Sequence, residues 1–263
     1  MSFIRALSFF PSLQLALILL TTLLPSCSSS LAEDSQSSSP FQTSVLIAIQ
    51  EMPTGGGYSG TDTTKNLLCQ ACKAGSNGTL IFEPAAAKPS FCSGATYLVF
   101  LKALAAQTSL SPTEAAQWVV QPNQSDGSGL FGRWNANGPG CAKLISDLDA
   151  GDNFSSWEKA QAGDFLKIWW TESIGGNERG HHVVYLSHTT NELTFWSSNL
   201  ETGYSTKTIP RARCKRVLFT RITKPTQLRK ASRLPATDPW LERMLHDDFT
   251  WREVAKTCEV NED

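Results

Sequence analysis

A long apolar pattern begins just after Cys92, which follows the sequence Lys-Pro-Ser-Phe. Every position in 97–101 is apolar, and apolar residues continue to Ala106, which exceeds the usual length of a strand. We therefore predict a helix that is buried on all sides, with Ser90 as its N-cap and Cys92 in its first turn. A buried β-strand is the alternative, because Tyr, Val and Phe also favour strands.

Further helices are predicted in the first 150 residues. Ser111, Pro112 and Glu114 combine a cap, a proline at the first helical position and a capping-box acid, and the helix that they start should extend to Val120. The other predicted elements are a strand or short buried helix at 44–49, a glycine-rich loop at 54–60, a helix at 61–74, a glycine-rich loop with an exposed tryptophan at 132–140, and a helix at 141–148.

The second half of the chain has the shorter apolar runs of strands. Strands are predicted at 165–170, 181–186, 193–197 and 215–222, and the polar turn at 189–192 joins two of them into a hairpin. A helical segment is predicted at 239–256. Because helices come first and strands follow, we assign the chain to the α+β class, with N-terminal helices packed on an antiparallel sheet.

The N-terminal residues have the pattern of an export signal. Met1–Arg5 is short and positive, and Leu13–Leu24 is apolar but shorter than a membrane span. The sequence Leu-Pro-Ser-Cys that ends at Cys27 resembles a bacterial lipoprotein cleavage site, and ordinary cleavage after Ala32 is the alternative. We predict export to the periplasm or outer envelope. A possible lipid anchor at Cys27 would be the only contact with the membrane.

Composition divides the rest of the chain into segments. Residues 28–43 are rich in serine and are predicted to be a flexible tether after the signal peptide at 1–27. Residues 44–224 are predicted to form the domain, and residues 225–263 a C-terminal helical extension. The chain has 23 basic and 24 acidic residues and a formal net charge of −1, which lacks the basic excess of nucleic-acid binders.

The seven cysteines suggest oxidative chemistry rather than metal binding. Cys69 and Cys72 form a C-x-x-C pair, but a zinc site needs two more ligands, and no second such pair exists. In an exported protein we expect disulfides instead. The candidate partners are Cys141, Cys214 and Cys258. No metal or organic cofactor is expected.

Cys92 is the candidate nucleophile, because the start of a helix favours a thiolate. Such a thiolate needs a base and a group that orients the base. His181 and His182 begin the same predicted strand, and side-chain alternation places only one of them on a given face. On the return strand, Asn199 is chemically the best orienting group because its oxygen accepts from an imidazole N–H, and Ser197 is the alternative.

Three motifs follow one another along the chain: Phe-Cys-Ser-Gly at 91–94 before the apolar helix, Gly-Asp-Phe-Leu at 163–166, and His-His-Val-Val-Tyr-Leu at 181–186. Their order, spacing and predicted structure resemble those of the NlpC-type, papain-like cysteine peptidases and amidases of bacterial cell walls. The resemblance extends from Cys92 to about Asn199. It matches His181, and not its neighbour, to the catalytic base of that family.

The resemblance implies a papain-like fold and hydrolysis of amide bonds in peptidoglycan peptides. Cys92 would attack the amide carbon, and His181 would transfer the proton. Asn199 stands where this family more often has a third catalytic histidine. Tyr58 is similar in place to an upstream tyrosine that assists the family's oxyanion site.

Tryptophans are the remaining candidates for contact with a substrate. Trp134 lies in the predicted loop at 132–140, which we expect to touch the substrate. Trp170 is a further candidate to line a cleft, whereas core packing is expected for Trp169 and Trp196.

Two other functions are compatible with these patterns. One is a non-catalytic domain of papain-like fold that binds the cell envelope, and it differs from the enzyme in having an unreactive Cys92. The other is an antibacterial amidase effector, against which the export signal and the serine-rich tether argue.

Overall fold

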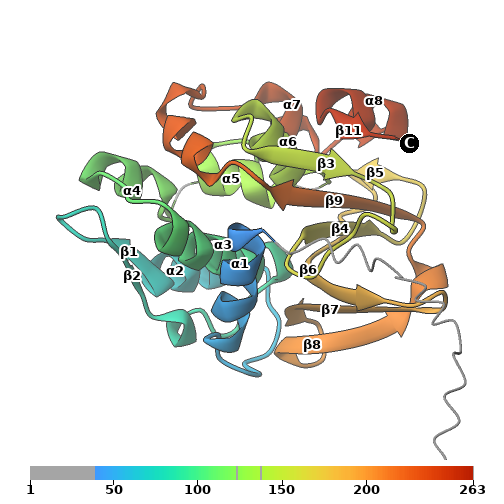
Figure 1. Ribbon diagram of the computed structural model, residues 1–263, viewed down its shortest axis with the longest axis horizontal. Helices are drawn as coiled ribbons and strands as arrows, with labels where there is room; N and C mark the ends of the chain where they lie inside the picture. The colour runs from blue at the N-terminus through green and yellow to red at the C-terminus, as the bar shows by residue number, and fades with distance from the viewer. Residues whose placement is uncertain (1–38, 123, 137, 263) are drawn as a thin grey trace, which may run out of the picture. The chain divides into compact units, whose positions relative to one another are not determined.

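The computed structural model describes residues 39–262 except residues 123 and 137, and every structural statement below concerns that part of the chain. The predicted signal peptide, Cys27 and residues 28–38 of the predicted tether lie outside it. The described chain has an α+β architecture in which helices pack on a seven-stranded sheet (Figure 1). None of its helices is both long and apolar enough to span a membrane.

The helices are α1 (Pro40–Gln50), α2 (Asp62–Ala71), α3 (Cys92–Gln107), α4 (Pro112–Trp118), α5 (Gly129–Asn135), α6 (Gly140–Asp147), α7 (Pro239–Arg243) and α8 (Trp251–Thr257). Short 3₁₀ segments occupy Pro84–Ala86, Arg211–Arg213 and Pro225–Arg233. The predicted start of α4 is confirmed, because the side chain and backbone of Ser111 and Glu114 bond each other reciprocally.

The strands are β1 (Cys72–Ala74), β2 (Leu80–Phe82), β3 (Gly151–Phe154), β4 (Phe165–Trp169), β5 (Ile174–Gly175), β6 (His181–His188), β7 (Glu192–Asn199), β8 (Gly203–Pro210), β9 (Arg216–Ile222), β10 (Asp248–Phe249) and β11 (Val260–Asn261). The main sheet has the order β11-β3-β9-β4-β6-β7-β8. Its pairs are antiparallel from β3 to β8, as predicted, and β6 and β7 form the predicted hairpin. The prediction is wrong at one edge, where β11 runs parallel to β3.

Side-chain alternation along the strands separates two apolar layers. On β9, Leu218 and Ile222 pack with the helices, whereas Val217 and Phe219 belong to a cluster on the opposite face of the sheet. That second cluster is covered by side chains from loops and from the 3₁₀ segment Arg211–Arg213, such as Trp157 and Cys214. The helical layer therefore covers one face of the sheet, and irregular segments cover the other.

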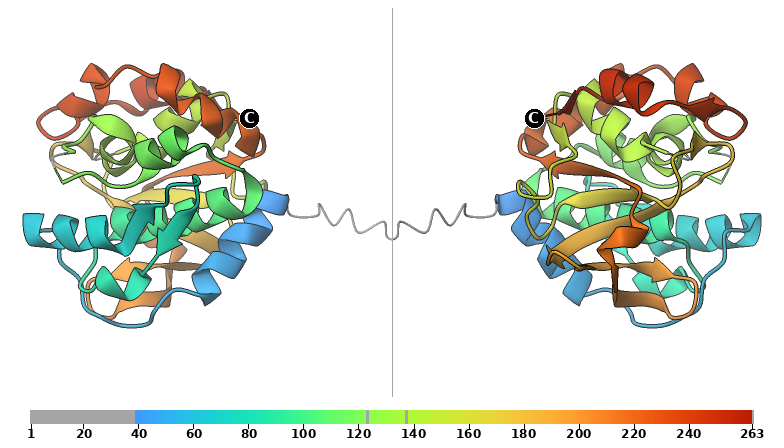
Figure 2. Two further views of the ribbon diagram at one scale, coloured as in Figure 1. Left: turned by 90° about the vertical axis from the view of Figure 1, so that its left-hand side faces the viewer. Right: turned by 90° about the vertical axis from the view of Figure 1, so that its right-hand side faces the viewer.

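Helix α3 lies at the centre of the helical layer. Its residues from 93 to 104 are buried except Lys102, which confirms the predicted helix that is buried on all sides. It packs against β6 and β7 on one side and against α1 on the other, where the rings of Phe41 and Phe100 lie 6.2 Å apart (Figures 1 and 2). Each large apolar side chain buried in this way contributes about 1.5–3 kcal/mol, which fixes α3 on the sheet.

Helix α1 begins earlier than the sequence pattern predicts. Ser39 and Gln42 form a capping box, and Pro40 occupies the first turn. Residues 40–43 are therefore helical rather than part of a tether, and residues 44–49 continue the helix rather than form a strand. The Gln42 side chain also donates to buried Asp164 at 2.8 Å, which attaches the start of α1 to the sheet.

Residues 225–262 are integrated with the rest of the chain. The predicted helical segment at 239–256 consists of α7 and α8 separated by β10, and β11 extends the main sheet. Arg133 on α5, which is 2% exposed, donates to Asp238 at 3.0 Å and to the carbonyl oxygen of Pro235 at 2.9 Å. An ion pair between two buried side chains and a hydrogen bond to the backbone therefore attach this segment to α5.

The predicted surface loop at 132–140 is wrong over residues 132–135, which are helical, and in the expected exposure of its tryptophan. Residues 129–135 form α5, and Trp134 is only 2% exposed. A Cβ added to Gly132 would lie 2.0 Å from the carbonyl oxygen of Ser125, and one added to Gly140 would lie 2.2 Å from that of Arg133. The glycines in this stretch therefore permit close packing between backbones rather than loop mobility.

The predicted disulfides are also wrong for the described chain, in which all six cysteines are free. The candidate residues are distributed over separate apolar clusters. Cys72 and Cys141 belong to the cluster around α3, Cys258 to the cluster of α7 and α8, and Cys214 to the opposite face of the sheet. These cysteines serve as small apolar side chains in the core.

Candidate active site

Cys92 is the first residue of α3 and is half-buried. Phe91 occupies the N-cap with an extended backbone and no side-chain capping bond, so the predicted N-cap at Ser90 is wrong. The carbonyl oxygen of buried Ser90 instead accepts hydrogen bonds from the Ser59 amide at 2.9 Å and the Ser198 hydroxyl at 3.1 Å. The first amide N–H groups of a helix have no intrahelical acceptors, so Cys92 lies at a positive helix end.

The open end of the hairpin supplies an imidazole and an amide. His181 begins β6 and Asn199 ends β7, and the antiparallel pairing brings the two residues together. His181 Nε2 lies 3.1 Å from Asn199 Oδ1. The sequence therefore placed the candidate base and its orienting group in the correct strands, 18 residues apart along the chain.

The orientation of the Asn199 amide determines which imidazole nitrogen carries a proton. Asn199 Nδ2 donates to the carbonyl oxygen of Ser205 at 3.0 Å and to that of Ser197 at 3.3 Å. Because these acceptors require the NH₂ group, Oδ1 must face His181. Nε2 is then the donor in the neutral imidazole, and Nδ1 is the nitrogen left for the Cys92 thiol.

The Cys92 thiol ionises more readily than an ordinary cysteine. Burial raises its pKa, but the hydrogen bond with His181, the positive charges of His181 and Lys167, and the backbone N–H of His182 outweigh burial and lower the pKa to about 6. A free cysteine has a pKa of about 8.5. The thiolate, which is the reactive form, therefore predominates at neutral pH.

His182 occupies a different environment. It is 4% exposed, its Nδ1 lies 2.8 Å from the hydroxyl oxygen of Thr96 on α3, and its ring packs against Trp134 with centroids 5.1 Å apart. Burial, followed by the positive charges of Lys167 and His181, keeps the pKa of His182 well below its usual range. His182 is therefore a neutral residue of the core.

The alternation of side chains places His182, not His181, on the face covered by α3. The His181 ring lies on the opposite face, where it packs against Phe195 at 5.5 Å. It still reaches Cys92 because it stands at the first residue of β6, where a side chain passes the end of the sheet. Side-chain alternation alone thus does not identify the histidine that forms the hydrogen bond with the thiol.

The loop at 54–60 places a hydroxyl group beside the thiol. Tyr58 pairs with Ser90 through an isolated β-bridge, and the Tyr58 hydroxyl donates to Cys92 Sγ at 3.8 Å. Burial, the negative charge of Cys92 and this hydrogen bond raise the pKa of Tyr58. The phenol therefore remains a hydrogen-bond donor at neutral pH.

Backbone hydrogen bonds hold the same loop on β8. The amide and carbonyl groups of Gly55 bond those of Tyr204, each at 3.0 Å. Gly203 makes this approach possible, because its φ is +66° and an added Cβ would lie 2.4 Å from the Gly55 carbonyl oxygen. The backbone of the loop therefore approaches β8 closely, and the glycine that permits this approach lies on the strand.

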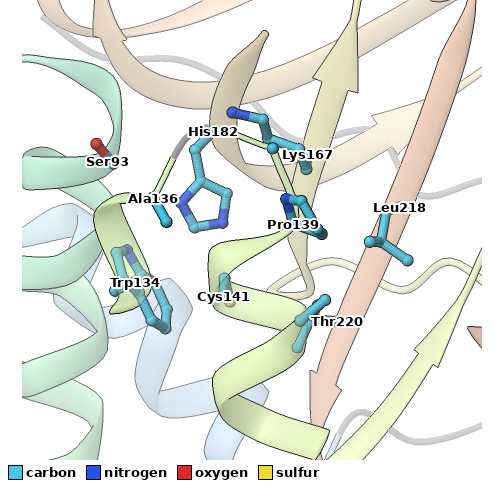
Figure 3. Close-up of a pocket in the computed structure, with 11 residues that line it drawn as sticks. Ser93, Trp134, Ala136, Pro139, Cys141, Lys167, His182, Leu218 and Thr220 are labelled. Atoms are coloured by element: carbon cyan, nitrogen blue, oxygen red, sulfur yellow. The ribbon is translucent and has the colours of Figure 1, made fainter. Parts of the chain in front are cut away.

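A buried polar layer lies behind the nucleophile candidate. A cavity of about 10 Å³, room for one water molecule, is lined by side chains that include Ser93, Lys167, His182 and Thr220 (Figure 3). Lys167 is 8% exposed, and its ammonium group donates to the carbonyl oxygen of Arg179 at 2.6 Å. Burial lowers the pKa of Lys167, while the negative charge of nearby Cys92 acts in the opposite direction.

The predicted substrate contact Trp134 belongs to this layer rather than to the surface. Its indole N–H donates to the Thr96 hydroxyl at 3.3 Å, which itself bonds His182. Its ring packs against Phe165 with centroids 4.9 Å apart. Trp134 therefore supports the helix that carries Cys92, and its 2% exposure leaves no surface for a ligand.

A groove of about 200 Å³ opens beside the candidate catalytic residues. Half-buried Trp170 lines it and stacks on His181, with centroids 6.3 Å apart and an interplanar angle of 30°. Trp170 is thus placed as a cleft residue, while Trp169 and Trp196 are in the core as expected. The groove is lined by Tyr58, Trp170, Gly180, His181, Phe195, Asn199, Leu200, Lys207, Ile209 and Arg213.

Four residues that the sequence marked as candidates lie together in the structure, namely Cys92, His181, Asn199 and Tyr58. Sequence reasoning missed Lys167. The signal for Lys167 was present as a single charge inside the apolar strand Phe-Leu-Lys-Ile-Trp, because buried lysines are rare without a specific role.

Comparison of the chain with protein-family models, with curated proteins and with solved structures finds no match. Within the described residues, no group of three or more histidine, cysteine, aspartate or glutamate side chains is arranged to hold a metal ion.

Proposed function

We propose that the chain is an exported cysteine hydrolase of papain-like fold that cleaves amide bonds, with Cys92, His181 and Asn199 as its catalytic residues. The observation that carries the proposal is the complete arrangement around Cys92. The thiol stands at a helix start with a pKa lowered to about 6, it meets an imidazole, and an oriented amide lies behind that imidazole. A cysteine with only a packing role needs none of these features.

The arrangement provides each step of an acyl transfer. The Cys92 thiolate attacks the amide carbon, and a C–S bond forms as the carbonyl oxygen becomes an oxyanion. The Cys92 N–H and the Tyr58 hydroxyl are the donors placed to stabilise that charge. Imidazolium His181 gives its Nδ1 proton to the leaving nitrogen as the C–N bond breaks, which leaves a thioester on Cys92.

Water completes the cycle. A water molecule loses a proton to Nδ1 of His181 and attacks the thioester carbon. The carboxylic acid departs as the C–S bond breaks, and the thiolate of Cys92 and the imidazolium of His181 are regenerated. Throughout, Asn199 holds the imidazole through Nε2, so that Nδ1 faces both the sulfur and the leaving group.

The proposed substrate is peptide material of peptidoglycan. The motif resemblance and the signal-like N-terminus support this choice, because both are typical of enzymes of the cell envelope. The groove beside His181 is open at the surface and is walled by strands, a form suited to an extended peptide. An antibacterial effector would share the chemistry and differ only in its destination.

Digestion of purified peptidoglycan tests the proposal. The mature protein should release peptide fragments, separable by chromatography, and Cys92→Ala should release none above background. Cys69→Ser is the matched control, because it removes another partly exposed thiol that is outside the site, and it should retain activity. Equal release by the wild type and Cys92→Ala would refute the catalytic function and favour a binding domain.

A further inference from the structure

The groove beside His181 combines apolar walls with positive charge. Trp170, Phe195 and Ile209 provide apolar surface, and Lys207 and Arg213 add positive charge to that of the candidate base. No aspartate or glutamate is among the residues that line it. Most of the residues that line the groove lie at the open end of β6, on β7 and β8, and in the 3₁₀ segment that follows β8.

Arg213 is held in place without a charged partner. Its guanidinium lies 5.5 Å from the centroid of the Trp170 ring, a cation–π contact that restricts the side chain. Among the described residues, no carboxylate lies within ion-pair distance of Arg213. Arg213 is an exposed residue that lines the groove, so the hydrogen-bond donors of its guanidinium are available to a ligand there.

Trp170 also fixes the distance between Arg213 and the reacting centre. The centroid of the Trp170 ring lies 6.3 Å from that of the His181 ring and 5.5 Å from the Arg213 guanidinium carbon. Together, these two distances limit the separation of the imidazole and the guanidinium to the length of about three or four residues of extended peptide. A group that binds Arg213 would therefore be close in sequence to the bond that His181 serves.

Lys207 provides the second positive charge. It lies on β8 opposite Phe195 on β7, and its ammonium group is 3.3 Å from a carboxylate oxygen of Glu201. The Glu201 side chain is 79% exposed, and such surface ion pairs contribute only about 0–1 kcal/mol. A carboxylate in the groove can therefore take the place of Glu201 at little cost.

We propose that this groove is a subsite for a carboxylate of the peptide substrate, with Arg213 as the principal contact and Lys207 as the second. The substrate class is then an acidic peptide, with its carboxylate within about four residues of the bond that is cleaved. The guanidinium can bind a carboxylate through two parallel hydrogen bonds, and the ammonium group adds a point charge. The identity of the cleaved bond rests on the proposed function, whereas the carboxylate preference rests on the groove.

Paired substrates test the subsite. Soluble peptidoglycan peptides are compared in two forms, with native carboxylates and with every carboxylate replaced by a carboxamide. We expect kcat/KM to be about 10- to 100-fold higher for the carboxylate form, the range for a hydrogen-bonded ion pair. Arg213→Gln should remove most of that difference, and Lys207→Gln a smaller part. Added salt should reduce the preference of the wild type.

Arg211→Gln is the matched control. It removes a positive charge two residues away, but the Arg211 guanidinium lies over Trp157 at 4.3 Å and outside the groove. This variant should keep the full preference. If Arg211→Gln and Arg213→Gln reduce the preference equally, general charge and not the groove selects the substrate, and the proposal is wrong.

A binding measurement separates this proposal from the proposed function. Cys92→Ala is titrated with the same two peptides, and isothermal titration calorimetry measures their affinities. If wild-type cleavage depends on Cys92 but both forms are cleaved equally, the subsite is refuted and the hydrolase stands. If no cleavage occurs yet the carboxylate form binds more tightly, and Arg213→Gln abolishes that difference, the subsite stands without the hydrolase. Equal binding without cleavage refutes the subsite.

Discussion

The two adjacent histidines of β6 occupy opposite environments. His181 is half-buried at the mouth of a groove, bonded to Asn199 and covered by Trp170. His182 is buried under α3, bonded to Thr96. Both have the same chemistry as free amino acids. Because adjacent side chains of a strand point to opposite faces, one histidine is a candidate proton carrier and the next is a packing residue.

A polar group near a nucleophile need not take part in catalysis. His182 contributes its backbone N–H to the Cys92 thiolate, while its ring stays neutral in the core. His181 has access to water and to a ligand in the groove, which proton transfer to a substrate requires. The comparison predicts separable effects when each residue is changed.

The largest effect is expected from His181→Ala. Loss of the base should lower kcat/KM for peptide hydrolysis by about 10²–10⁴-fold, and the melting temperature should stay near that of the wild type because the site is half-exposed. His188→Ala serves as the control, since that histidine lies at the far end of the strand, where its ring bonds the Tyr185 hydroxyl and packs on Trp157. Full activity in His181→Ala would show that another group acts as base.

His182→Ala should act on stability instead. It removes a buried ring that packs against Trp134 and the hydrogen bond between that ring and the Thr96 hydroxyl, so the free energy of unfolding should fall by about 2–4 kcal/mol. Thr96→Val should give a smaller loss in the same direction. Chemical denaturation measures both. A large loss of kcat in folded His182→Ala, with unchanged unfolding, would make His182 the functional histidine and contradict the assignment.

Asn199→Ala should reduce activity less than His181→Ala. The imidazole loses the bond that holds Nε2, and we expect a decrease in kcat/KM of about 10- to 100-fold. Ser205→Ala is the milder comparison, because it removes the Ser205 hydroxyl that accepts from Asn199 Nδ2 at 3.0 Å but keeps the Ser205 carbonyl oxygen that also accepts from it. If Asn199→Ala retains wild-type rates, the imidazole is held by other contacts and Asn199 is not catalytic.

The smallest effect concerns the pH dependence of the thiol. Alkylation by iodoacetamide should slow as pH falls through about 6, because protonation removes the reactive thiolate. Lys167→Met removes one of the positive charges that stabilise the thiolate, so the midpoint should move to higher pH. Lys102→Met is the control, since Lys102 is paired with Glu51 at 2.7 Å. An unchanged midpoint in Lys167→Met would show that the buried charge does not act on Cys92.

Part of the fold and of the site could be predicted from local signals. The capping residues before Pro112 marked the start of α4, and the apolar run after Cys92 marked α3. The same kind of reasoning failed at Trp134. Glycine-rich sequence near it was interpreted as a loop, but these glycines allow backbones to touch, a contact with residues that no local pattern names.

The amino-acid order alone specified α3, α4, the hairpin and the residue types that a thiol hydrolase would use, because capping, turns and periodicity act over a few neighbouring residues. Assembly of the chain was needed to bring Cys92 to His181 and to set Tyr58 beside the sulfur. Folding also assigned opposite roles to the two histidines. Those properties depend on burial and on charges from distant segments, such as Lys167, which exist only once the helix lies on the sheet.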